Sequence, residues 1–286
     1  MHSRPSLRGI KSFIRYQSLA SVGGVIVLLF LLTGLLAPWV APYDPTRVSV
    51  RETLEPPGQR HLLGTDNLGR DMLSRIMYGA RLSLTLAVAG VGTGTLIGVT
   101  LGILAGWYRR LETAIMRIMD VVLCFPGIII AMTIIAILGS GVENVIIAIA
   151  ISRIPQFARL THGLTLSVRE KDFVEAAISM GASGRRIMSR HILPNIMAPI
   201  MVQISLMIPG AIMTLAGLSF LGLGVVPPTP EWGSMLQNSL QWSRLAPHVM
   251  VLPGLALMLV VFGFNTFGDG LRDALDPWVS KGRGRG

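Results

Sequence analysis

The feature that most constrains the fold of this chain is a series of long apolar stretches. A helix needs roughly 20 mostly apolar residues to cross a bilayer. Six such stretches lie at residues 19–41, 82–108, 113–138, 142–158, 196–224 and 249–268. The fourth is the weakest, since its continuous apolar core covers only 145–151 before Ser152 and Arg153. With 51% hydrophobic and 14% charged residues, the sequence predicts an all-α integral membrane protein with six transmembrane helices.

The basic residues are distributed unequally between the segments that join these stretches. With the N-terminus inside, 18 of the 25 basic residues fall on the inner side, which carries +10, while the outer segments are neutral. Because Lys and Arg are retained on the cytoplasmic side, this pattern predicts cytoplasmic N- and C-termini and supports the fourth span. It also argues against a nucleic-acid partner, since a basic DNA-binding domain clusters its charge on a soluble fold.

Four glycines of the second stretch are spaced four residues apart and therefore share one helix face: Gly94, Gly98, Gly102 and Gly106. Small residues at this spacing allow another helix to approach closely, and in lipid such packing is a main source of helix association. The pattern predicts a helix at the centre of the bundle.

Arg117 and Asp120 stand at i and i+3 near the cytoplasmic end of the third stretch. We expect them to pair on one helix face, since an unpaired charge at membrane depth is costly. A proton relay is disfavoured, because the other spans carry no carboxylate in their middle. Prolines interrupt several spans and indicate either kinks or a pathway, namely Pro126, Pro155, Pro209 and Pro253.

No catalytic motif is visible in the sequence. The phosphate-binding pattern G-x-x-x-x-G-K-[ST] is absent, so any ATP that drives the protein must bind another polypeptide. The histidines are scattered and Cys124 has no second thiol, which disfavours a metal site. The acidic and histidine residues of the outer segment 61–75 are interpreted as surface charges between glycine turns. The sequence therefore predicts a chain that is not an enzyme and binds no cofactor or metal itself.

The segment "DFVEAAISMGASGRRIMSRHILPN" (172–195) is the most charged interior connection. Phe173, Ala176, Ala177 and Met180 follow helical spacing, so we expect a short amphipathic helix with an apolar face of small residues. Gly181 would end this helix, Ser183 would cap the next, and Pro194 would lie in the first turn of the fifth span. Two interpretations stay open here.

The first interpretation is that this helix docks into a groove of a soluble partner. The second is that it lies on the membrane surface, where Arg185, Arg186 and Arg190 would contact anionic lipid. Helical periodicity alone does not separate them.

The spacing in this segment resembles the EAA signature of permease subunits of bacterial ABC importers. Glu175, Ala176 and Ala177 are followed by Gly181 and then by the ending Leu193-Pro194. The family's Ile before x-Leu-Pro is His191 here, in a "RHILPN" form that is similar to the peptide and nickel permeases.

Three further stretches are similar to the same branch: "HLLGTDNLGRDMLSRIMYGARLSL" (61–84), "LSFLGLGVVPPTPEWGSML" (218–236) and "FNTFGDGLRDALDP" (264–277). Together these motifs resemble the C-type subunit of the dipeptide, oligopeptide and nickel permeases.

The resemblance implies a type I ABC importer fold in the bacterial inner membrane. It divides the chain into a cytoplasmic segment with the first span (1–60), an exterior segment (61–81), the transmembrane domain (82–277) with its coupling segment (160–194), and a basic tail (278–286). Its coupling helix would contact an ATPase through Glu175, Ala176, Ala177, Met180, Gly181, Arg185, Leu193 and Pro194. The implied partners are a homologous B-type permease, two ATPase subunits that hold ATP and Mg²⁺, an extracytoplasmic substrate-binding protein, and membrane lipid.

The function implied is half of a translocation pathway for dipeptides or oligopeptides. Nickel or its chelates, glutathione and opines are alternative substrates of the same machinery. An ion-driven secondary transporter is the alternative from another class, and it would require inverted repeats and carboxylates at the membrane midplane.

Overall fold

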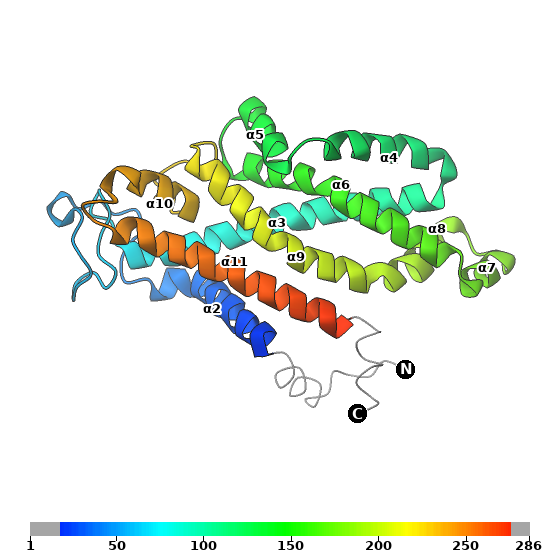
Figure 1. Ribbon diagram of the computed structural model, residues 1–286, viewed down its shortest axis with the longest axis horizontal. Helices are drawn as coiled ribbons and strands as arrows, with labels where there is room; N and C mark the ends of the chain where they lie inside the picture. Colours follow the sequence, from blue (N-terminus) through cyan, green and yellow to red (C-terminus); the bar gives the residue numbers. More distant parts are fainter. Residues whose placement is uncertain (1–17, 276–286) are drawn as a thin grey trace.

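The computed structural model describes residues 18–275, and within this range the chain is helical with no β-strand. Its long helices run side by side along the longest axis (Figure 1). They are α2 (Ser18–Val40), α3 (Met72–Trp107), α6 (Val142–Arg169), α9 (Leu193–Phe220) and α11 (His248–Leu275). The all-α prediction is therefore confirmed for the described part of the chain.

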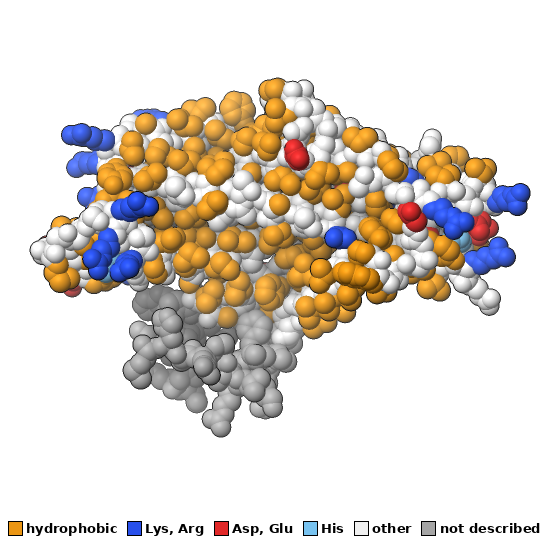
Figure 2. Space-filling model, turned by 180° about the vertical axis from the view of Figure 1, so that it is seen from behind, with side chains coloured by type: hydrophobic (Ala, Val, Ile, Leu, Met, Phe, Trp, Pro, Cys, Tyr) orange, Lys and Arg blue, Asp and Glu red, His pale blue; other side chains and the backbone are white. Residues whose placement is uncertain are grey.

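Short helices and loops lie at the two ends of this bundle (Figure 1). One end carries α7 (Asp172–Ser179) and α8 (Gly184–Ile187), which a π-helical turn, η2 (Met188–Ile192), joins to α9. The opposite end carries the loop 41–71 with η1 (Val50–Glu52), and also α10 (Trp232–Ser239) with η3 (Leu240–Trp242). Hydrophobic side chains cover the middle of the molecule and charged ones gather toward these ends, as expected of a membrane protein (Figure 2).

Among residues 18–275, four helical segments are long and apolar enough to cross a membrane: Leu19–Val40, Met72–Trp107, Gly184–Phe220 and His248–Leu275. A fifth arises if α4 (Arg109–Leu123) and α5 (Gly127–Leu138) count as one span, although the two are bent by 93°. The span predicted over 113–138 therefore consists of two helices, and the break lies at Pro126, which was expected to interrupt it. Pro126 explains the break, since proline lacks an N–H and disfavours the helical conformation of the residue before it.

The predicted fourth span corresponds to α6, which has 28 residues and extends to Arg169 instead of residue 158. It does not reach the hydropathy of the four segments above. The burial of α6 explains its lower hydropathy. This helix packs along α3 and also contacts α5 and α9. A helix covered by protein on a broad face needs no continuous apolar surface.

The second helix begins before its predicted apolar stretch. It starts at Met72, where the Asp71 side chain caps it by accepting a hydrogen bond from the Ser74 N–H at 2.8 Å. Capping by a carboxylate satisfies an amide that would have no partner in the first turn. The first turns of α3 therefore belong to the polar end of the molecule. The predicted basic tail (278–286) and the first 17 residues lie outside the described residues.

Candidate functional site

The four glycines of α3 all lie against α6. A Cβ added to Gly98 would come within 2.7 Å of the Ile154 carbonyl oxygen, and one on Gly102 within 2.6 Å of the Ala158 carbonyl oxygen. Gly94 and Gly106 make equally close approaches, to the backbone of Ala150 and to the side chain of Thr165 respectively. We call this contact the glycine seam. It joins two long helices backbone to backbone over about three turns.

The predicted ion pair between Arg117 and Asp120 is wrong. Asp120 pairs instead with Arg159 of α6, through a contact between the Arg159 guanidinium and the Asp120 carboxylate. A second contact between the same helices joins His162 Nε2 to Glu112 Oε1 at 3.1 Å. Because α4 lies beside α6, a cation on the neighbouring helix reaches Asp120. Both partners are about half exposed, so the pair adds little stability.

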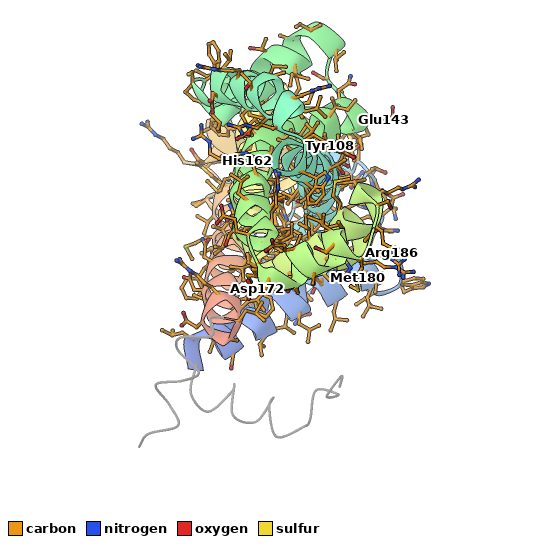
Figure 3. The ribbon with its side chains drawn as sticks, turned by 90° about the vertical axis from the view of Figure 1, so that its right-hand side faces the viewer. Tyr108, Glu143, His162, Asp172, Met180 and Arg186 are labelled. Carbon is orange, nitrogen blue, oxygen red and sulfur yellow. The ribbon has the colours of Figure 1, made fainter. Side chains whose placement is uncertain are left out.

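Helix α7 lies across the end of the bundle, running from Asp172 toward Met180, with Arg186 at the Met180 side (Figure 3). The helix ends as predicted near Gly181, which has a φ of +79°. The Gly181 N–H donates to the Ile178 carbonyl at 2.9 Å, and the Ala182 N–H donates to the Ala177 carbonyl at 3.0 Å. These two bonds form a Schellman motif, in which a left-handed residue satisfies the last carbonyls of a helix.

The inner face of α7 consists of Val174 and Ala177, which are 0% and 2% exposed. They belong to a small hydrophobic cluster whose other buried members come from α3, α6, α8, η2 and α9: Ile103, Val168, Ile187, Ile192, Ile196 and Ile200. The prediction that Ala177 shares an open face with Ala176 is therefore wrong. Val174 and Ala177 are three residues apart and therefore lie on one side of α7. Their packing against the cluster holds this eight-residue helix in place.

The outer face of α7 is open and partly apolar. Met180 is 81% exposed, Ile178 51% and Phe173 40%, and Glu175 and Ala176 are also exposed. Large apolar side chains gathered on an open surface are typical of an interaction site. The anchored inner face holds this outer face in a fixed position.

Two contacts at this end were not revealed by the sequence, and the first connects it to the bundle. The Arg169 guanidinium lies over the Trp107 ring, 5.4 Å from its centroid, and a Cβ on Gly184 would come within 2.8 Å of Trp107 Nε1. The Phe173 and His191 rings, whose centroids are 6.4 Å apart, connect α7 to η2. The sequence signal for the contact between Arg169 and Trp107 was the position of Trp107 directly after Gly106, the last glycine of the seam.

The turn from α8 into α9 contains further predicted residues. Ser183 precedes α8, but its side chain makes no capping hydrogen bond, and Pro194 lies at the start of α9 as expected. Between them, η2 is a π-helical turn, a feature often found at functional sites and not predicted from the sequence. An open basic pocket lies on this surface and is lined by Ser183, Arg185, Arg186, Ser189 and Arg190.

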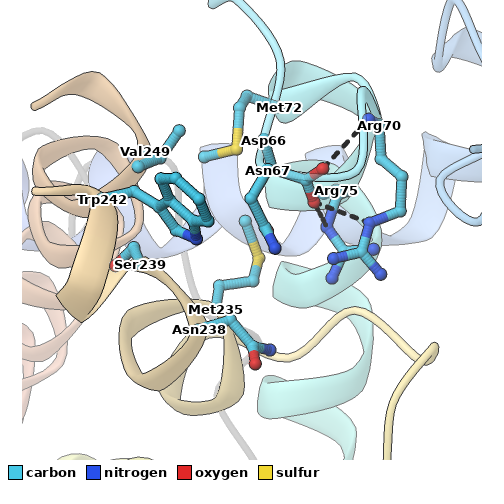
Figure 4. A pocket seen from close by; sticks show the side chains of 10 residues that line it. All are labelled: Asp66, Asn67, Arg70, Met72, Arg75, Met235, Asn238, Ser239, Trp242 and Val249. Carbon is cyan, nitrogen blue, oxygen red and sulfur yellow. Dashed lines mark hydrogen bonds and ion pairs between the residues drawn. The ribbon is translucent and has the colours of Figure 1, made fainter. Parts of the chain in front are cut away.

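At the opposite end, residues expected to be surface charges are buried. His61, Asp66 and Asp71 are 5%, 6% and 2% exposed. Asp66 Oδ2 pairs with Arg70 Nε at 2.6 Å and with Arg75 Nε at 3.4 Å (Figure 4). The Asp66–Arg75 pair connects the loop 41–71 to the first turns of α3, while the Asp66–Arg70 pair lies within the loop. Pairing explains how these buried charges are accommodated.

Glu231 is a third buried acid of this end, with 0% exposure. Its carboxylate caps α10 by accepting hydrogen bonds from the Gly233 and Ser234 N–H groups, both at 2.9 Å. Burial raises the pKa of the Glu231 carboxyl above its usual value, because desolvation disfavours the charged form more than these bonds favour it.

Comparisons with known proteins agree with this architecture. Residues 98–281 match the family described as binding-protein-dependent transport system inner membrane component, and residues 14–57 match the N-terminal transmembrane domain of oligopeptide transport permease C. The chain therefore belongs to the permease family of binding-protein-dependent ABC transporters.

Individual relatives cover almost the whole chain. The glutathione transport system permease protein GsiD of Pectobacterium atrosepticum is 47% identical over 93% of this chain and 89% of its own length. The dipeptide transport system permease protein DppC of Alkalihalophilus pseudofirmus is 45% identical over 92% of this chain and 87% of its own length.

A solved structure shares the fold. The chain is similar to a chain of the MetNI methionine ABC transporter in an inward-facing form, with a TM-score of 0.59 and 18% identity, covering 72% of this chain and 98% of that one. At this identity the likeness concerns the fold alone. The protein is thus an inner-membrane permease subunit of the peptide and glutathione importer family, which works with a binding protein and separate ATPase subunits and is not itself the catalyst.

Proposed function

We propose that this chain forms half of the translocation pathway of an ABC importer for dipeptides, oligopeptides or glutathione. In this proposal it has six spans and cytoplasmic termini, pairs with a homologous B-type permease, and receives substrate from an extracytoplasmic binding protein. The substrate assignment is supported by the relatives that carry glutathione and dipeptide transport in their names. Two partner ATPase subunits hold the ATP and Mg²⁺. Nickel chelates and opines are the competing substrates.

The observation that carries the proposal is the anchored and exposed helix α7. Its outer face presents Glu175, Ala176 and Met180, while Val174 and Ala177 fix it to the bundle. We assign this outer face to a groove of one ATPase subunit. Closure of the ATPase dimer on ATP binding would then displace α7 as a rigid body.

Movement of α7 reaches the membrane through the segment that follows it. Gly181 sets the direction of the turn, and Leu193 and Pro194 begin α9, whose buried Ile196 and Ile200 belong to the same cluster as Val174. A displacement of α7 therefore moves the inner end of α9. Arg185 lies exposed beside this path and supplies positive charge to the ATPase surface.

A pair of charge reversals tests the docking of α7. Glu175→Arg should lower ATPase stimulation by the loaded binding protein and uptake of labelled Ala-Ala or glutathione by at least tenfold in proteoliposomes. The matched control is Glu143→Arg, because Glu143 is also an exposed first-turn glutamate, on α6. Both variants should assemble normally. Equal uptake by the two variants would contradict the docking role, and import of nickel alone would contradict the peptide assignment.

A further inference from the structure

Arg153 is a half-buried cation in the middle part of α6. It is the twelfth of the 28 residues of α6, and its side chain reaches α9. There Nη2 lies 3.3 Å from the Thr214 hydroxyl oxygen and Nη1 lies 3.8 Å from the Met207 sulfur. Among the described residues no carboxylate lies within 4 Å of the guanidinium, and its buried Nε has no hydrogen-bond partner. The hydrogen-bonding neighbours of Arg153 in the described part of the chain are therefore neutral.

A second buried polar atom without a partner lies close by in the sequence. Gln156 stands three residues after Arg153 on α6, and its Oε1 makes no hydrogen bond. Residues three apart lie on the same side of a helix, so the two side chains project from the same side of α6. The Arg153 guanidinium is a positively charged hydrogen-bond donor and the Gln156 Oε1 is a hydrogen-bond acceptor. Together they match a ligand that has both an anionic group and an N–H group.

The surrounding backbone leaves space for the guanidinium. A Cβ on Gly210 of α9 would come within 3.2 Å of Arg153 Nη2, so glycine at this position lets the side chain lie against the α9 backbone. Pro155 and Pro209 lie inside α6 and α9, next to Ile154 and Gly210 respectively, and both helices continue through them. Helix-breaking prolines at membrane depth are tolerated where the backbone is covered by protein or lines a water-filled path.

An ionisable side chain in such a place requires a counter-charge. Charged residues inside membrane domains face a pathway or the bundle interior and pair with a partner, and they mark routes for substrates or ions. Arginine is suited to carboxylates in particular, because its planar fork donates two parallel hydrogen bonds to the two oxygens.

We propose that Arg153 and Gln156 form a carboxylate-binding site in the translocation pathway between α6 and α9. Arg153 binds the terminal carboxylate of the transported peptide, and Gln156 Oε1 accepts a hydrogen bond from a peptide N–H. This inference rests on the proposed function, since it assigns a substrate subsite to that pathway. It explains why α6 carries a cation that no residue of the described chain neutralises.

The test uses two substitutions of similar length that differ in charge. Arg153→Lys keeps the cation and Arg153→Met removes it, and each is reconstituted with the partner subunits and the binding protein. Uptake of labelled Ala-Ala and glutathione is measured beside ATP hydrolysis. We expect Arg153→Met to lower uptake at least tenfold and Arg153→Lys at most threefold, with ATPase stimulation within twofold of wild type in both. Arg159→Gln, which removes an exposed cation of the same helix, should leave uptake unchanged.

Other outcomes separate the possible failures. Loss of complex assembly in Arg153→Met would show that Arg153 supports the structure of the transporter instead of binding substrate, and would overturn the inference. Equal uptake by the Lys and Met variants, whether high or low, would also overturn it, because a carboxylate site depends on charge. If wild-type complex imports neither probe, the proposed function fails and the subsite fails with it.

Discussion

Two groups of glycines in this permease are required for opposite reasons. In the glycine seam, Gly98 and Gly102 have no room for a Cβ, because the α6 backbone occupies that space. At the end of α7, Gly181 has nothing within 4 Å of its Cβ position but holds a φ of +79°. The seam therefore depends on volume, whereas the α7 turn depends on backbone conformation. A closed contact between helices and an open surface for a partner impose different demands on the same residue type.

The largest expected effect follows from filling the seam. Gly102→Val would place methyl groups against the Ala158 carbonyl and Thr161, and overpacking of this kind costs roughly 1–3 kcal/mol or more. Thermal unfolding of the detergent-solubilised permease should show the loss. Gly92→Val is the matched control, because a Cβ at Gly92 of the same helix meets nothing within 4 Å. Equal destabilisation by Gly102→Val and Gly92→Val would contradict the claim that the seam depends on the volume at its glycines.

The next effect separates the two alanines of α7. Ala177→Leu should destabilise the end of the bundle by about 1–3 kcal/mol, because Ala177 is packed in the small cluster. Ala176→Leu should leave stability unchanged and lower ATPase stimulation, since Ala176 is exposed. Unfolding curves and ATPase rates of the assembled transporter measure both quantities. If Ala176→Leu were the more destabilising change, the assignment of inner and outer faces would be wrong.

A smaller effect is expected at Gly181. Valine in a left-handed conformation costs about 1–2 kcal/mol, and asparagine adopts it more readily. Gly181→Val should therefore uncouple ATP hydrolysis from uptake while the permease still accumulates, and Gly181→Asn should restore most of the coupling. Uptake per ATP hydrolysed is the measurement. Poor coupling in both variants would indicate that a side chain of any kind at position 181 disturbs the contact with the ATPase, whatever the backbone conformation.

The smallest expected effect concerns the buried acid at the other end. Because the folded-state pKa of Glu231 is raised, its contribution to stability is present below the ordinary pKa of about 4.3 and is lost as pH rises through the raised value. Melting temperatures between pH 4 and pH 8 should therefore fall more steeply for wild type than for Glu231→Gln. Identical slopes would mean that Glu231 does not contribute to the pH dependence.

The sequence correctly predicted the features that depend on the spacing of residues close together in the chain. Spacing of four residues identified the glycine stripe, and the positions of Gly181 and Pro194 fixed where α7 ends and α9 begins. The interior segment could be interpreted as a docking helix or a lipid-bound helix until its resemblance to the EAA signature was considered. Features that depend on a neighbouring helix were missed, such as the Asp120 pair with Arg159 and the inward direction of Ala177.

The sequence by itself determined that this is a helical membrane protein of the binding-protein-dependent permease family, because hydropathy and motif spacing are properties of the chain. Only the tertiary structure decided which side chains are buried and which residues they contact. It placed the four glycines against α6, buried His61 and Asp71, and left Arg153 facing α9 with no carboxylate partner among residues 18–275. The physical reason is that burial and pairing of a side chain depend on the element packed against it, and residues distant along the chain provide that element.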